Sequence, residues 1–452
     1  MRRIGSRWWR WRGILSPAVR AVGESEHSAF LDDRALRYVE ARESKRDGAV
    51  VTESRVVGLV TQDFTRAGGV GTVSRWLAST LSAAGWTVRV FQLAEHSSDV
   101  GAKSLIRPSS LKAPMMRWDE AAGLYHVGAW AAELEFMRYL PRRQLTGALD
   151  QCDVVQVVGG SPALGYAASR STAPLFLQMA TFIAWERPSA TRHLRGVRRA
   201  WSRVNTPPAT WVEGRALHAA RAVFIENDEV RIELDSRGIR GIHAPPGIDT
   251  NHFIPGQGPA RREYILSVGR LSESRKGYER MLASYAELRR IMPTAPPLLL
   301  AGKGALSPSV VRLITELKLH PHVQVRGDIP SGDLVTLIQG AAAFWMTSFE
   351  EGLGLSAVEA MACGVPVVAT DTAGTRVVVT SDVGALVDQN PFIPLEFATA
   401  TAEVLAAGAR LRTAARARAV SRFDTDVAIR PYLDAYEAAI GRGSDSGAEW
   451  RT

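Results

Sequence analysis

The chain has 452 residues, of which 46% are hydrophobic and 22% are charged. This length predicts two or three folded domains, large enough to bury a core without covalent staples. The two cysteines, Cys152 and Cys363, are too few for a disulfide framework or a four-ligand zinc site, and we expect no transmembrane helix, because no apolar run approaches ~18 residues.

Two arginine-rich segments together carry more positive charge than the net charge of the whole chain, which is +9. From Met1 to Gly23, six arginines and no acid are interleaved with three tryptophans, and six more arginines without an acid lie from Arg187 to Val212. Such segments attract phosphate groups on a nucleic acid, an anionic lipid or a phosphorylated substrate. No nucleic-acid-binding motif accompanies them, so we expect no nucleic-acid partner. The stretches from Met1 to Arg20 and from Arg187 to Arg203 favour an anionic membrane surface, which Arg and Trp side chains suit.

The start of the chain does not resemble a secretory signal, because no apolar core of about 7–15 residues follows its basic beginning. We therefore expect a cytoplasmic protein, peripheral on the inner face of the membrane. Residues 1–54 lack clear strand patterns and are predicted to form a basic, Trp-containing extension.

The regular pattern begins at residue 55. An apolar run over 55–61 predicts a buried parallel strand, and it is followed by a glycine loop, a helical stretch over 72–84 and a second strand over 87–93. This strand–glycine loop–helix–strand unit is typical of the opening of a doubly wound α/β domain.

Further apolar runs divide the rest of the chain into two parallel-sheet domains, 55–250 and 251–425. The predicted strands of the first domain continue at 153–158, 174–178 and 222–226, and those of the second lie at 264–268, 298–301, 323–325, 343–346 and 365–370. The region 426–452 is predicted to hold a helix over 427–440 that crosses back to the first domain, followed by a tail.

The strongest candidate site is the segment 348–366, where a strand ends, a glycine loop turns and a helix begins near Leu355. Backbone N–H groups at a helix N-terminus bind phosphate well. The groups expected to do so here belong to Gly352, Leu353, Gly354 and Leu355. Glu351 and Glu359, eight residues apart, can then reach opposite ends of a sugar nucleotide. Apolar residues flank Glu359, which argues against an idle surface carboxylate, the alternative reading.

This segment resembles the Glu-x7-Glu signature of glycosyltransferase family 4, whose members have the GT-B fold. A second stretch, Arg270 with Lys276 after the strand at 264–268, resembles the donor-diphosphate element of that family. Two positive groups at a strand end can neutralise a diphosphate leaving group.

Weaker resemblances extend over residues 55–440. Gly302 stands in a Gly-rich strand end, Arg326 and Ile329 in the stretch that faces the nucleotide base, and Gly69 with Val70 in the glycine loop across the cleft from the donor.

The resemblance implies two Rossmann-like domains facing across a cleft, with the donor bound by the C-terminal domain and the acceptor by the N-terminal one. It implies transfer of a sugar from a nucleoside-diphosphate sugar to an acceptor hydroxyl, with retention, in which Arg270 and Lys276 stabilise the diphosphate. Glu359 would bind the ribose and Glu351 the transferred sugar. The acceptor is expected to be a glycan or a lipid-linked precursor. No Asp-x-Asp cluster stands out, so we expect metal independence and no cofactor.

One departure concerns the N-terminal domain, where many members of the family carry a donor-contacting His. None is present over 176–182, although Gln178 or Thr181 could hydrogen-bond a sugar. Three alternatives remain open: a GT-B epimerase or phosphorylase, a non-catalytic assembly or membrane-binding protein, and nicotinamide binding at Gly69, for which the third glycine of the fingerprint is missing.

Overall fold

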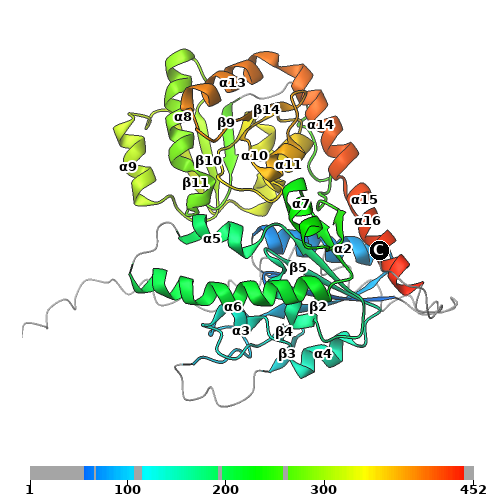
Figure 1. Cartoon of the computed structure of the whole chain (residues 1–452). Helices are drawn as coiled ribbons and strands as arrows, with labels where there is room; N and C mark the ends of the chain where they lie inside the picture. Colours follow the sequence, from blue (N-terminus) through cyan, green and yellow to red (C-terminus); the bar gives the residue numbers. More distant parts are fainter. Residues whose placement is uncertain (1–54, 66–67, 106–114, 192–195, 258–262, 442–452) are drawn as a thin grey trace, which may run out of the picture. The chain divides into compact units, whose positions relative to one another are not determined.

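The computed structural model describes residues 55–65, 68–105, 115–191, 196–257 and 263–441 (Figure 1). The predicted basic extension over residues 1–54 and the tail after 441 therefore lie outside the described residues.

The first sheet has eight strands in the order β3-β4-β2-β1-β5-β6-β7-β8. All pair in parallel except β3, which runs antiparallel to β4. The strands span Val56–Thr61 (β1), Thr87–Leu93 (β2), Met116–Asp119 (β3), Leu124–Val127 (β4), Val154–Gly159 (β5), Leu175–Met179 (β6), Ala222–Ile225 (β7) and Gly241–His243 (β8).

Helices cover both faces of the first sheet, and side chains from the sheet and the helices form a core on each face. They are α2 (Gly69–Ala83), α3 (Glu135–Arg138), α4 (Arg143–Leu149), a 3-10 helix (Pro162–Ala168), α5 (Ile183–Thr191), α6 (Val197–Ala219) and α7 (Asp228–Ser236). The continuous apolar runs of the central strands reflect this burial on two sides.

The second sheet has six strands, all parallel, in the order β11-β10-β9-β12-β13-β14. They span Tyr264–Val268 (β9), Leu298–Gly302 (β10), Val323–Gly327 (β11), Ala341–Met346 (β12), Val367–Thr370 (β13) and Gly384–Val387 (β14). One face packs against α8 (Tyr278–Ile291), α9 (Pro308–Glu316) and α13 (Pro394–Ala407). The other packs against α10 (Leu334–Gln339), α11 (Leu355–Ala362), α12 (Ala373–Val378) and α14 (Ala409–Phe423).

The end of the described chain packs against the first sheet, not the second. Tyr432 and Tyr436 of α16 (Arg430–Ile440) are fully buried in the core formed by that sheet and α2. The Tyr436 hydroxyl donates to Gln156 Oε1 at 2.6 Å, and the Tyr432 hydroxyl donates to Gln178 Oε1 at 2.5 Å. The helix predicted over 427–440 is in fact two helices, since α15 (Thr425–Ala428) precedes α16.

Several elements differ from the sequence-based expectations. Strands β3, β4, β8 and β14 were not predicted, because each has only three or four residues and lies at an edge of its sheet or next to one. The helix expected from residue 72 begins at Gly69 and has no side-chain cap to mark its start. The strand expected from 365 begins at Val367, because Pro366 has no N–H to contribute to a sheet.

Candidate functional site

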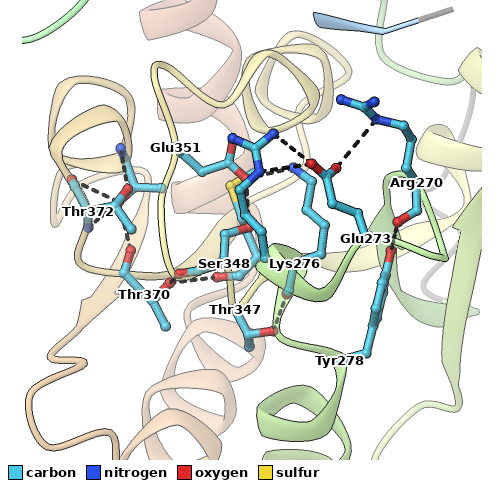
Figure 2. A network of polar contacts seen from close by, with 12 residues as sticks. Arg270, Glu273, Lys276, Tyr278, Thr347, Ser348, Glu351, Thr370 and Thr372 are labelled. Atoms are coloured by element: carbon cyan, nitrogen blue, oxygen red, sulfur yellow. Dashed lines mark hydrogen bonds and ion pairs between the residues drawn. The ribbon is translucent and has the colours of Figure 1, made fainter. Parts of the chain in front are cut away.

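The residues predicted to carry the chemistry gather at the carboxyl ends of β9 and β12, two neighbouring strands of the second sheet. Arg270 and Lys276 follow β9, and Ser348 and Glu351 follow β12 (Figure 2). Ligands of open parallel sheets bind outside the carboxyl ends of the strands. The geometry therefore places this candidate site where a doubly wound sheet binds its ligand.

Lys276 and Glu351 form a nearly buried ion pair. The Lys276 ammonium lies 2.6 Å from Glu351 Oε1, and the Ser348 hydroxyl donates to the same oxygen at 2.6 Å. The two side chains are 18% and 10% exposed. Burial acts to raise the pKa of Glu351, but the charge of Lys276 and the two hydrogen bonds outweigh it and lower the pKa. Glu351 is therefore a carboxylate at neutral pH.

A glycine brings the Lys276 loop onto the end of β12. Gly277 has φ 67° and ψ 40°, and a Cβ there would lie 2.2 Å from the Thr347 carbonyl oxygen. The Thr347 hydroxyl donates to the carbonyl oxygens of both Lys276 and Gly277. Only glycine combines this left-handed conformation with so close an approach, so Gly277 fixes the place of the lysine.

Arg270 is more exposed to solvent than the Lys276–Glu351 ion pair. Its side chain is 52% exposed, and its Nε lies 3.4 Å from Glu273 Oε2. The other oxygen of Glu273 accepts from Arg275 at 2.9 Å. The sequence singled out Arg270 and Lys276 but missed Glu273, which links two arginines of the loop. Three charged residues within six positions were the available signal.

Helix α11 begins at Leu355, as predicted, after Gly354 in the left-handed conformation (φ 93°). No side chain caps this helix start. Orphan N–H groups and the helix dipole favour an anion at such an end. Gly352, Leu353 and Gly354 thus link Glu351 to the helix that carries Glu359, and Leu355 is the first residue of that helix.

Glu359 is half-buried on α11, and burial raises its pKa to about 7. Burial thus moves the ionisation of this carboxyl towards neutral pH. Burial deprives such a carboxyl group of hydrogen bonds to water. A ligand hydroxyl that replaces those hydrogen bonds would stabilise it.

The neighbouring end of β10 is shaped by close backbone contact. Gly302 has φ 139°, and a Cβ there would lie 1.8 Å from the Gly269 carbonyl oxygen. The Asp328 N–H donates to Gly302 O at 2.6 Å, and Asp328 accepts from the Gly304 N–H at 3.0 Å. These bonds tie the end of β10 to the turn after β11.

Arg326 and Ile329 line a separate open cavity of about 1030 Å³ beside α10. Arg326 is exposed, whereas Ile329 packs partly against the core of the second sheet. Lys276, Glu351 and Glu359 do not line this cavity. The structure thus brings together the residues predicted to bind the diphosphate. The residues predicted to face the base line a different cavity.

Residues 250–420 match the family model described as glycosyl transferases group 1. Over 86% of its length the chain superposes on sucrose-phosphate synthase from Thermosynechococcus elongatus, with a TM-score of 0.62, 19% identity and 99% of that chain covered. HepE from Anabaena, solved with UDP-glucose, gives a TM-score of 0.62, 17% identity and coverages of 85% and 99%. This chain has the GT-B fold.

Curated relatives match over part of the GT-B chain. A D-inositol 3-phosphate glycosyltransferase of Segniliparus rotundus is 33% identical over 215 residues, 44% of this chain and 47% of the relative. A GDP-mannose-dependent alpha-(1-6)-phosphatidylinositol monomannoside mannosyltransferase of Mycolicibacterium smegmatis is 32% identical over 164 residues, 32% of this chain and 42% of the relative. The matched part thus spans about half the length of these relatives.

The first GT-B domain contributes contacts that the sequence did not reveal. The Asn227 side chain donates to Gly352 O at 3.0 Å, and a Cβ on Gly352 would lie 2.7 Å from both Ala180 Cβ and Glu226 Oε2. The acidic start of α7 is the only feature of the nearby sequence that could have drawn attention to these contacts. Gly69 and Val70, expected in a loop, lie in the first turn of α2.

Gln178 does not take the sugar-binding role suggested for it. Its side chain is 2% exposed, its amide donates to Glu226 Oε1 at 3.1 Å, and its oxygen accepts from Tyr432. Both ends of the amide are thus engaged within the protein. Thr181, two residues past β6, is half-buried.

The predicted membrane-binding segments are described only in part. The stretch from Met1 to Arg20 lies outside the described residues. Of the stretch from Arg187 to Arg203, Arg187 pairs with Glu135 and Arg203 is exposed. No helix in the described ranges is long and apolar enough to span a bilayer.

Proposed function

We propose that this chain is a retaining glycosyltransferase of family 4, which moves a sugar from a nucleoside-diphosphate sugar to an acceptor hydroxyl. The observation that carries the proposal is the buried ion pair of Lys276 with Glu351, set beside the uncapped start of α11. It lies within the segment that matches the glycosyl transferases group 1 model.

The proposed reaction breaks the bond between the anomeric carbon and the diphosphate oxygen, which keeps the electron pair. The acceptor oxygen forms the new bond on the same face of the sugar, and its proton passes to the departing diphosphate. The charges of Arg270 and Lys276 stabilise that diphosphate as its negative charge grows, together with the N–H groups of Gly352–Leu355. Preorganised donors of this kind act without further reorganisation.

The two glutamates have separate proposed roles. The Glu351 carboxylate accepts hydrogen bonds from the transferred sugar and stabilises positive charge near its ring. Glu359 binds the ribose hydroxyls, which would hydrogen-bond its half-buried carboxyl. Gly302 lies beside the donor at the end of β10, Arg326 and Ile329 contact the base, and Gly69 and Val70 face the donor from the first domain.

The acceptor is proposed to be a glycan or a lipid-linked precursor of a cell-surface glycan. The names of the two relatives described above refer to inositol 3-phosphate and to a phosphatidylinositol monomannoside. An exposed, acid-free stripe on α6 supports contact with an anionic membrane, since Val204 and Trp211 are 66% and 55% exposed and Arg203 and Arg215 lie beside them. A cytoplasmic, peripheral location is part of this proposal.

Metal independence is also proposed, because two cationic side chains stand where a metal would otherwise neutralise the diphosphate. Full activity in excess EDTA is the expected result. Loss of activity that Mg²⁺ or Mn²⁺ restores would overturn this part of the proposal.

Ligand-dependent thermal stabilisation tests the donor site. A ligand that binds the folded state raises the midpoint of unfolding. One of a panel of UDP-, GDP- and ADP-sugars should stabilise the wild type and the control K318A, altered at an exposed turn, but not K276A. Stabilisation by no nucleotide sugar, or equal stabilisation of K276A, would contradict the proposed site.

A further inference from the structure

A buried carboxyl from the first sheet lies against the loop that carries Glu351. Glu226 follows β7 directly and is 5% exposed. Its Oε1 accepts from the Gln178 amide at 3.1 Å, and Gln178 is in turn held by the Tyr432 hydroxyl. Helix α16 thus fixes Gln178, which fixes the carboxyl of Glu226.

The other oxygen of Glu226 faces Gly352. A Cβ on Gly352 would lie 2.7 Å from Glu226 Oε2, so only glycine leaves room for this carboxyl. The next residue, Asn227, donates from its side chain to Gly352 O at 3.0 Å. On the same segment, the Gly374 N–H donates to Glu351 O at 3.1 Å. The segment from Glu351 to Gly352 is therefore held both by α12 of its own domain and by the first domain.

We propose that Glu226 and Asn227 form a clamp that positions the Glu351–Gly352 segment, and that Glu226 works in its neutral, protonated form. Both are positioning residues that act through Glu351. The inference rests on the proposed function in so far as Glu351 acts on the donor.

The groups that face Glu226 come from both domains. They are the Glu351 carboxylate from the loop after β12, the Tyr432 hydroxyl from α16, the Gln178 amide from β6 and, against its backbone, the His243 ring from β8. The pKa of Glu226 is raised to about 7, mainly by burial; the Gln178 hydrogen bond acts to lower it, and the charge of Glu351 acts to raise it. Ionised Glu226 would set a second carboxylate against the loop of Glu351, and like charges repel.

The clamp predicts an alkaline limb in the pH profile of kcat/KM. Above the apparent pKa the protonated fraction falls tenfold for each pH unit, and kcat/KM of the wild type should fall with it. E226Q keeps the acceptor for Gln178 but has no proton to lose, so it should be active and lack this limb. N227A should lower kcat/KM and keep the limb.

A second buried glutamate offers a matched control. Glu213 is 1% exposed, accepts from the Ile183 N–H at 2.9 Å, and burial raises its pKa to about 7. Because it lies on α6 and not against the loop of Glu351, E213Q should keep the wild-type limb. An E226Q enzyme that retains the limb, or an E213Q enzyme that loses it, would overturn the clamp.

An infrared readout separates this inference from the proposed activity. The difference spectrum of wild type minus E226Q should contain the C=O band of a protonated carboxyl, and this band should titrate away near pH 7. If E226Q is folded and the difference spectrum at pH 6 lacks this band, Glu226 is not protonated and the proposed neutral form is wrong. If no sugar nucleotide is turned over by any variant, the proposed function fails while this band still decides the state of Glu226.

Discussion

The Lys276 ammonium and the Glu351 carboxylate lie 2.6 Å apart, although 75 residues separate them in the chain. Neither side chain is fully buried, and both lie at the carboxyl edge of the second sheet. A nearly buried ion pair contributes little to stability once its desolvation is counted. We therefore base its proposed role in chemistry on its place at the carboxyl edge of the second sheet of the GT-B fold.

Replacing Lys276 with alanine should lower kcat by about 10²–10³-fold, the effect expected for one preorganised contact to developing charge. The fold should persist, which circular dichroism can check. K318A is the matched control and should turn over at the wild-type rate. Turnover of K276A within a few-fold of the wild type would remove Lys276 from the proposed mechanism.

Gly302 should not tolerate a side chain. Its φ of 139° is unfavourable for alanine, and the added Cβ would overlap the Gly269 carbonyl oxygen at 1.8 Å. We expect G302A to lose more than ~2 kcal/mol of unfolding free energy in urea titrations. G147A on α4, where a Cβ meets nothing within 4 Å, should be neutral or stabilising by up to ~1 kcal/mol. Equal stability of the two variants would contradict this account of the β10 end.

The carboxyl of Glu213 should make the fold less stable as the pH rises. Its folded pKa of about 7 lies above the value of 4.5 for the unfolded chain, so the unfolded state releases its proton first. The free energy of unfolding therefore falls between pH ~4.5 and ~7 and then levels off. The free energy of unfolding of E213Q, relative to that of the wild type, should therefore rise by up to ~3 kcal/mol across this pH interval.

Denaturant titrations at pH 4.5 and 7.5 measure this gain. The variant E403Q, on an exposed position of α13, should stay within ~0.5 kcal/mol of the wild type at both pH values. A constant difference between E213Q and the wild type would show that Glu213 ionises in the folded state.

The hydroxyl of Tyr436 should stabilise the attachment of α16 to the first sheet. It donates to Gln156 Oε1 at 2.6 Å, and both residues are fully buried. Y436F leaves the amide oxygen without this donor, which should cost about 1–3 kcal/mol. Y166F, a half-buried ring packed against Trp211, should cost less than ~0.5 kcal/mol. A neutral Y436F would contradict the importance of this bond.

The long buried strands could be predicted from the sequence, and β2 and β9 have the predicted bounds. Their apolar runs report burial on two faces directly. Strands such as β3 are different, since three or four residues at a sheet edge carry too little pattern. The start of α2 was misplaced because glycines at residues 68, 69 and 71 suggest a loop, whereas the helix simply begins without a cap.

For the candidate site, the resemblance to glycosyltransferase family 4 assigned Lys276 and Glu351 to one donor site, and the structure brings them to the ends of two neighbouring parallel strands. The contacts of Gly352 could not be predicted, since Asn227 is 125 residues away and comes from the other domain. The role of Gln178 was misjudged for the same reason, because its partners Glu226 and Tyr432 come from distant parts of the chain.

Release of nucleoside diphosphate tests the central claim most directly. Purified protein would be incubated with each of several UDP-, GDP- and ADP-sugars, with and without a membrane extract as the acceptor source. We predict that one donor yields free nucleoside diphosphate in an acceptor-dependent manner, and that K276A reduces the rate at least ~100-fold. Failure of every donor, epimerisation of the intact donor, or equal release by K276A would contradict the account.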